Sequence, residues 1–189
     1  MADSENALIT VDYARQMLGA EVDEIASIDN LIDAASSAAN SYTKRKLKTR
    51  SHTVVLDGTG KNTLLLPEYP VTAFTSLFID RDRTFGADTE ITDYYVHEEL
   101  GELYYGGTFP KVWKCVKAVF TAGYGTEEQP IPEDIKIAII ETVQWYRSRL
   151  AGEGIGVTAI QNPNGITTRY EADLPVSARR RLDAYVRPL

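Results

Sequence analysis

Residues 119–136 read VFTAGYGTEEQPIPEDIK and mark a change from strand-like to helix-like sequence. The stretch from Val112 to Tyr124 is rich in β-branched and aromatic residues, which predicts a strand that ends near its glycines. Pro130-Ile131-Pro132 then precedes two acidic residues, a combination typical of the first turn of a helix. Apolar residues recur at helical spacing beyond this point, so we predict a helix from Pro132 to about Arg149.

Two further helices are predicted before this segment. Thr10 can cap a short helix over residues 11–19, because its hydroxyl accepts a backbone hydrogen bond and Gly19 permits a left-handed ending. From Asp23 to Tyr42, apolar residues at spacings of three, four or seven predict a longer helix with one buried face.

The region between these helices and Pro130 has the composition of a β region. Residues 52–57 and 63–66 flank a glycine-containing turn and predict a β-hairpin, and Val71 to Asp80 predicts another strand. Residues 94–99 and 102–105 flank Leu100-Gly101 and predict a second hairpin.

The polar stretch 151–173 predicts a long flexible loop or arm, with at most a short hairpin near Gly165. Leu174-Pro175 then begins a final helix that continues to Val186. We therefore predict a single α+β domain over residues 1–189, mainly a helical bundle with an inserted antiparallel β region. The segments of this domain are helices at about 10–47 and 131–150, the β insertion at about 52–124, and the C-terminal helix and tail at 174–189.

The bulk composition excludes several function classes. The 189 residues carry a net charge of -7 with a pI near 4.9, which argues against a surface that binds nucleic acid by neutralising phosphates. The N-terminus lacks the cationic start and apolar run of a signal peptide, and no later stretch reaches the ~18 apolar residues of a membrane helix. Cys115 is the single cysteine, so we expect no internal disulfide and a small buried side chain at this position.

The sequence contains no recognisable catalytic constellation. His52 and His97 lie in predicted strands without a nucleophile or metal ligand at a known spacing, so we expect structural roles for both. Gly58-Thr59-Gly60-Lys61 resembles part of a phosphate loop, but Asn62 replaces the required hydroxyl and no helix follows. We predict that the protein is not an enzyme and binds neither a cofactor nor a metal ion.

Two basic clusters remain as candidate binding residues. One follows the long N-terminal helix and comprises Lys44, Arg45, Lys46, Lys48 and Arg50. The other is Arg179-Arg180-Arg181 in the last helix. Either cluster could contact DNA or an acidic partner, and either could equally be a solvated face that complements a helix dipole.

Several short motifs occur in a recognisable order: IDNLIDAA at 28–35, SYTKRKL at 41–47, VFTAGYG at 119–125, IPEDIK at 131–136 and Trp145-Tyr146. This order resembles the head-tail connector family of tailed phages, which includes adaptor and head-completion proteins. Leu174-Pro175, the late arginines and Tyr185 are similar to the family's last segment. The family commonly has glycine at the position where this chain has Lys44.

The resemblance implies a structural protein of a siphophage virion, assembled in the host cytoplasm and located at the head-tail junction. About twelve copies would form a ring beneath the portal protein, with the helices as the ring body. The ring would extend the DNA channel, make transient contact with the genome, and provide the platform for the next connector, stopper or tail protein.

The resemblance also implies roles for the candidate residues. The C-terminal segment would dock on the portal through Leu174, Pro175, Arg179, Arg180, Arg181, Leu182 and Tyr185. The basic cluster Lys44, Arg45, Lys46, Lys48 and Arg50 would lie at an interface or along the DNA channel.

Three alternatives remain open at this point. Another ring-forming virion component, such as a stopper or tail-completion protein, would differ mainly in the neighbour that it contacts. A small nucleic-acid-binding module that uses the Lys44 to Arg50 cluster would bind duplex DNA with a steep salt dependence. A hydrolase would require a pocket in which His52 or His97 meets distant carboxylates.

Overall fold

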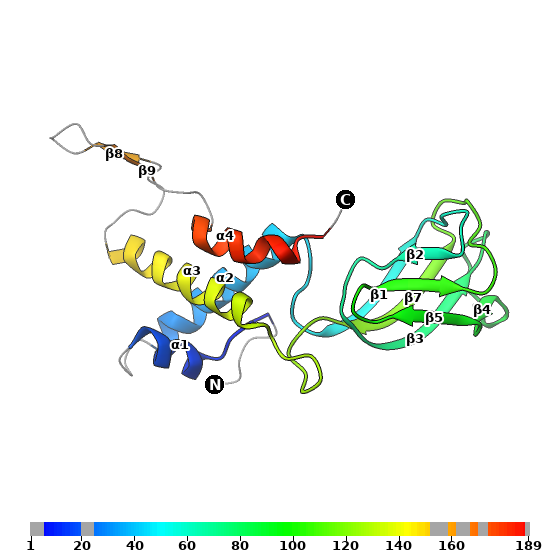
Figure 1. The fold of residues 1–189 in the computed structure, drawn as a ribbon, viewed down its shortest axis with the longest axis horizontal. Coiled ribbons are helices and arrows are strands. Elements are labelled where there is room, and N and C mark those ends of the chain that lie inside the picture. Colours follow the sequence, from blue (N-terminus) through cyan, green and yellow to red (C-terminus); the bar gives the residue numbers. More distant parts are fainter. Residues whose placement is uncertain (1–5, 20–24, 152–158, 162–166, 170–173, 188–189) are drawn as a thin grey trace. The chain divides into compact units, whose positions relative to one another are not determined.

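The computed structural model describes residues 6–19, 25–151, 159–161, 167–169 and 174–187. The chain divides into two compact units (Figure 1). The helical unit comprises residues 1–45 and 131–189. The β unit comprises residues 46–130, and every residue of the β unit is described.

The helical unit contains α1 (Val11–Leu18), α2 (Ile25–Thr43), α3 (Glu133–Ala151) and α4 (Val176–Leu182), followed by the 3-10 turn η3 (Asp183–Tyr185). The predicted cap of α1 is confirmed: the Thr10 hydroxyl accepts a hydrogen bond from the Tyr13 N–H at 3.2 Å, and Gly19 has a φ of 61°. The helices pack through apolar side chains that are fully buried, namely Ile28, Ile32, Ile135, Ile139 and Leu182. These buried positions confirm the helical periodicity predicted for α2 and α3.

The β unit contains two antiparallel sheets. The first has the strand order β1-β7-β3-β4. Its strands are β1 (Arg50–Leu56), β7 (Val116–Ala122), β3 (Val71–Ile79) and β4 (Glu90–Ile91). The 3-10 turn η2 (Ala87–Thr89) precedes β4. The second has the order β2-β6-β5, with β2 at Thr63–Leu65, β6 at Glu102–Tyr105 and β5 at Tyr94–His97. Both sheets contribute to one core, which includes Leu64, Leu103, Phe109 and Phe120.

A third antiparallel pair, β8 (Ala159–Gln161) and β9 (Thr167–Arg169), lies in the helical unit's sequence after α3. It confirms the short hairpin that we predicted near Gly165. The predicted flexible loop around it, at 152–158, 162–166 and 170–173, lies outside the described residues.

The fold is α+β, as predicted, but the prediction of mainly a helical bundle is wrong. The strands build a compact unit with its own core instead of an appendage to the helices. The reason is the central strand β7, whose alternate residues Val116, Ala118, Phe120 and Ala122 are all buried. A strand paired on both sides and buried on one face organises a core independently of any helix. That residues 1–189 act as a single connector domain stays a prediction.

The first predicted hairpin is also wrong. β1 pairs with β7, and β2 pairs with β6 in the other sheet, so residues 57–62 connect two sheets. Within this connection, the Gly58 N–H donates to the Val112 carbonyl at 2.9 Å and the Gly60 N–H to the Phe109 carbonyl at 3.0 Å. The glycines therefore serve a close approach to residues 109–112 and not a tight reversal. The second predicted hairpin is confirmed by the pairing of β5 with β6.

Candidate interaction surfaces

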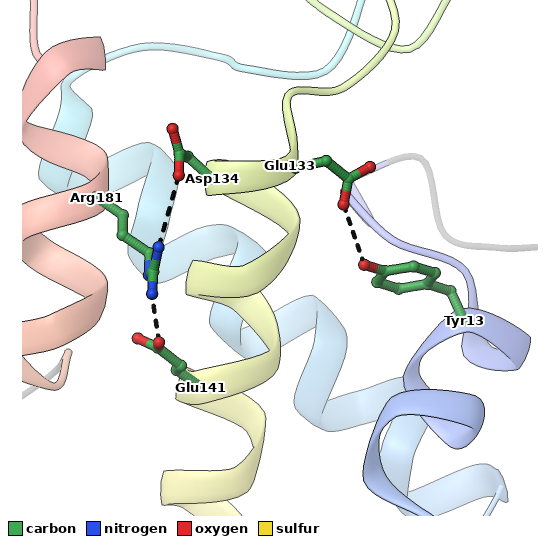
Figure 2. Close-up of polar contacts among 5 residues, drawn as sticks. All are labelled: Tyr13, Glu133, Asp134, Glu141 and Arg181. Carbon is green, nitrogen blue, oxygen red and sulfur yellow. Dashed lines mark hydrogen bonds and ion pairs between the residues drawn. The ribbon is translucent and has the colours of Figure 1, made fainter.

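The C-terminal helix α4, which carries most of the predicted portal-docking residues, is packed into the helical unit. Leu174 is 2% exposed and Leu182 is fully buried, so both belong to the core. Arg181 links α4 to α3: its Nε donates to Glu141 Oε1 at 3.2 Å, and its Nη1 lies 3.6 Å from Asp134 Oδ1 (Figure 2). Both pairs are partly exposed, so each contributes at most about 1 kcal/mol. Among the candidate docking residues, these three face the chain's own interior or α3.

The remaining docking candidates are more accessible. Arg180 is exposed, whereas Pro175, Arg179 and Tyr185 are half-buried. The carbonyl oxygen of Tyr185 accepts a hydrogen bond from Arg45 Nη1 at 3.1 Å, which fixes the backbone beyond α4. Among the docking candidates, Arg180 is thus the exposed residue of α4, and the other exposed residues of this helix are Val176 and Ser177.

The end of α2 holds the segment that follows α4. The Tyr42 hydroxyl donates to Asp183 Oδ1 at 2.5 Å, and this hydrogen bond raises the pKa of Tyr42. The Arg187 N–H donates to the Thr43 carbonyl at 3.0 Å. The chain beyond α4 is thus tied to α2 by side-chain and backbone contacts.

The residues of the basic cluster after α2 differ in their exposure. Arg45 is 2% exposed and belongs to the helical unit, where its guanidinium contacts the C-terminal segment. Lys44 and Lys46 are exposed, whereas Lys48 and Arg50 are half-buried at the start of the β unit. An interface or channel role stays a prediction for the four residues that reach the surface.

The acidic start of α3 connects it to α1. The Tyr13 hydroxyl donates to Glu133 Oε2 at 3.4 Å (Figure 2), and Lys136 Nζ donates to the other carboxylate oxygen at 2.6 Å. The hydrogen bond from Lys136 lowers the pKa of Glu133, whereas burial and the neighbouring carboxylate raise the pKa of Tyr13. These contacts join two helices and leave the carboxylate ionised at neutral pH.

The two histidines and the cysteine all lie in the β unit. His52 stacks on Phe120 with the ring centroids 5.5 Å apart, and burial lowers its pKa. His97 lies on β5 in the other sheet. Cys115 is buried and free, as expected, and its Sγ donates to the Val112 carbonyl at 3.2 Å. Within the described part of the chain, no cluster of three or more His, Cys, Asp or Glu side chains could hold a metal ion. Nor is any described helix long and apolar enough to cross a membrane.

One surface of the β unit was not predicted. The face of the β2-β6-β5 sheet that points away from the core exposes Leu65 to 63%, Tyr95 to 66% and Tyr104 to 36%. The two tyrosine rings lie 6.3 Å apart, and the Tyr104 hydroxyl donates to Glu102 Oε2 at 2.7 Å, which raises the pKa of Tyr104. A signal existed in the tyrosine doublets 94–95 and 104–105: adjacent residues of a strand face opposite sides, so one tyrosine of each pair must point outward.

A second unpredicted feature lies where β3 ends and β7 begins. Trp113 is 65% exposed, and the guanidinium carbon of Arg83 lies 5.7 Å from its ring centroid. The loop that carries Arg83 is organised by Asp80, whose carboxylate accepts hydrogen bonds from the N–H groups of Phe85, Asp82 and Thr84 and from the Thr84 hydroxyl. These hydrogen bonds, led by the one from Phe85, lower the pKa of Asp80 to about 2.

Comparison with known proteins adds a family and a fold. Residues 7–185 match the family model described as head completion protein. No curated protein sequence matches the chain. A similar chain in the neck of an empty gene transfer agent (GTA) particle, computed with C6 symmetry, has a TM-score of 0.65 at 19% identity, covering 100% of this chain and 94% of that one. A chain in the neck of a native GTA particle, computed with C12 symmetry, has a TM-score of 0.63 at 18% identity, covering 100% and 93%. A chain in the virion of a native GTA particle has a TM-score of 0.62 at 18% identity, covering 100% and 94%.

Proposed function

Because the chain belongs to the head completion protein family, we propose that it is an adaptor, one subunit of a ring beneath the portal at the head-tail junction. The family assignment confirms the predicted resemblance and makes the chain a structural virion protein and not an enzyme. The proposed ring extends the DNA channel and offers a platform to the next connector, stopper or tail protein.

The observation that carries the proposal is the family match over residues 7–185, which includes both the helical unit and the β unit. The likeness to neck proteins supports it, since their folds align with the whole chain and those necks were computed with C6 and C12 symmetry. A ring of about twelve copies agrees with the C12 neck and requires two different, complementary surfaces on every copy.

Within this assembly, α4 is the docking element for the portal. Arg180 and Arg179 are the residues of α4 that are open to charge-assisted hydrogen bonds with carboxylates on the portal. Leu174, Leu182 and Arg181 hold the helix in place from the other side. The net charge of -7 favours passage of DNA, because a channel wall that does not bind phosphate tightly lets the duplex slide.

The test is mass determination of the full chain, alone and mixed with a portal ring, by native mass spectrometry. Ring-sized species or saturable binding to the portal support the adaptor role. A chain that stays monomeric and does not bind the portal contradicts the adaptor role. Steeply salt-dependent binding to duplex DNA would then favour the nucleic-acid-binding alternative.

Point variants localise the docking surface more safely than truncation, since removal of α4 also removes the buried side chains of Leu174 and Leu182. Arg180→Ala is expected to weaken portal binding. Gln144→Glu is the matched control, because it lowers the net charge by the same amount at an exposed position of α3. Equal effects of the two variants would show that charge alone matters and that α4 is not the docking element.

A further inference from the structure

The exposed large hydrophobic side chains of the β unit gather on two surfaces. They are Leu65, Tyr95, Leu100, Tyr104 and Trp113. The first four belong to the outer face of the β2-β6-β5 sheet and to the turn between β5 and β6, and we call them the tyrosine face. Trp113, with Arg83 stacked on it, forms the tryptophan tip at the end of the other sheet. A solvated sheet face ordinarily carries polar residues, so both surfaces need an explanation.

The strand register places the tyrosine face together. Tyr95 lies opposite Tyr104, and Leu65 lies opposite Glu102, which is two residues from Tyr104 and therefore on the same side of the sheet. A hollow of about 560 Å³ adjoins the face at Leu65 and is also lined by its strand neighbours Thr63 and Glu102. This hollow is open to solvent and offers room for an aromatic ring beside Leu65.

The two surfaces differ in charge. Glu98 and Glu99 are exposed beside Leu100, Glu102 lies between Leu65 and Tyr104, and the adjoining hollow adds Asp57 and one cation, Lys61, so acidic groups predominate on this surface. At the tip, Arg81 and Arg83 are exposed with one exposed carboxylate, Asp82, between them. The neighbouring Asp80 carboxylate is engaged by the hydrogen bonds that fix the loop.

The tryptophan tip has the residue types and the preformed loop of a protein-binding surface. Trp, Tyr and Arg are the residues that most often dominate binding energy at protein interfaces. The Asp80 hydrogen bonds hold the tip loop in one conformation before contact, which reduces the entropy lost on binding.

A second copy of the chain is the partner that this complementarity selects. Pairing of one tyrosine face with another would bring Glu98, Glu99 and Glu102 of two copies together, and such like-charge contact opposes binding. It would also be a twofold contact that ends at a dimer. A contact between two different surfaces repeats from copy to copy and can close a ring.

We infer that neighbouring copies contact each other through their β units, with the tryptophan tip of one copy seated on the tyrosine face of the next. This inference rests on the proposed ring function and assigns one of its subunit interfaces. The guanidinium of Arg83 then lies near the carboxylates of the face, and the indole of Trp113 covers Leu65 and the two tyrosine rings.

Chemical cross-linking tests the geometry while keeping Trp113, Arg83, Leu65 and the two tyrosines. Leu100→Cys and Arg81→Cys place thiols at the rim of the face and of the tip, and both positions are exposed. A bis-maleimide added to rings of the full-length double variant should give a ladder of covalent multimers. A matched control combines Arg81→Cys with Thr53→Cys, an exposed position on β1 of the other sheet, and should give no ladder. Equal cross-linking in both, or dimers from Leu100→Cys alone, would overturn the inference.

Substitution tests the contribution of the contact. Trp113→Ala should reduce ring formation by at least about tenfold, and adding Tyr104→Ala should reduce it little further, because both side chains serve one contact. Thr53→Ala is the control that should assemble normally. Unchanged thermal unfolding of the Trp113 variant would verify that its fold is intact.

The outcomes separate the two proposals. Rings that assemble normally with Trp113→Ala and give no ladder overturn the tip-on-face contact and leave the adaptor role standing. An unmodified chain that forms no ring and does not bind the portal overturns the adaptor role. It also overturns the proposed contact of the tryptophan tip with the tyrosine face, which rests on that role.

Discussion

Replacing Lys44 with glycine should stabilise the helical unit, because Lys44 occupies a backbone conformation that favours glycine. The residue follows the last residue of α2 with a φ of 56°. The Arg45 N–H donates to the Asn40 carbonyl at 3.2 Å, which is the hydrogen bond of a Schellman helix ending. Glycine is the residue that most often occupies the left-handed position of such an ending.

The expected magnitude follows from two opposing effects. A side chain in the left-handed conformation costs roughly 1–2 kcal/mol, which glycine removes. Glycine also increases the freedom of the unfolded chain, which costs about 0.4–1 kcal/mol. The free energy of unfolding should therefore rise by about 0.5–1 kcal/mol, which corresponds to about 1–4 °C in thermal midpoint for a protein of this size.

Differential scanning calorimetry of the full chain measures this shift, with Lys44→Ala as the matched control. Alanine removes the same exposed, charged side chain but keeps Cβ, so its midpoint should stay within about 1 °C of the unmodified protein. A glycine variant no more stable than the alanine variant would refute the conclusion that the backbone at Lys44 is strained.

Three further predictions concern one buried residue, Leu182, and two titrating groups, Asp80 and His52. Leu182→Ala should lower the free energy of unfolding by about 2–5 kcal/mol in urea denaturation, whereas Arg180→Ala should change it by less than about 0.5 kcal/mol; equal effects would contradict the burial of Leu182. The pKa of Asp80 is held at about 2, below its ordinary 3.8, so its carboxylate stabilises the fold above pH 3.8 and this contribution is lost as the pH falls through 2. Asp80→Asn should remove that loss from the thermal midpoint measured against pH, and an unchanged acid profile would contradict it. Burial lowers the pKa of His52 below 6.5, so the unfolded chain binds the proton more tightly and stability should fall as the pH drops below 6.5. His52→Gln should flatten the slope in this range, whereas a slope that persists must come from another group.

The helices could be predicted from the sequence because their signals are local. The Thr10 hydroxyl and Gly19 define both ends of α1, and Pro132 with its following acids defines the start of α3. Each signal acts within one turn of the helix that it describes.

The local pairing of β5 with β6 could be predicted, but pairing between strands far apart in the chain could not. β1 pairs with β7, and no feature of Arg50–Leu56 identifies that partner. Gly58 and Gly60 carry the composition of a hairpin turn, yet their N–H groups are used by residues 109–112. Turn chemistry thus indicates a change of direction without indicating which strand comes next.

The candidate docking residues show a related limit. Leu174 and Leu182 are apolar residues of an amphipathic helix, and the same residue types build both cores and interfaces. Arg45 belongs to a basic run that looks solvated in the sequence, but it is buried against the C-terminal segment. The sequence did not distinguish the inward residues of these segments from the outward ones.

The tyrosine face and the tryptophan tip, which were not predicted from the sequence, bear on which unit of the proposed ring contacts neighbouring copies and which contacts the portal. In the helical unit, Met17, Leu150 and Val176 are also exposed, and α4 turns Arg180 outward. In the β unit, the tyrosine face and the tryptophan tip place large apolar side chains at positions that face solvent, where polar residues are usual. A ring held only through the helical units would leave Tyr95 and Trp113 in water in every copy. If the β units join neighbouring copies, both exposures are accounted for by one repeated contact, and the solvent side of α4 remains available to the portal.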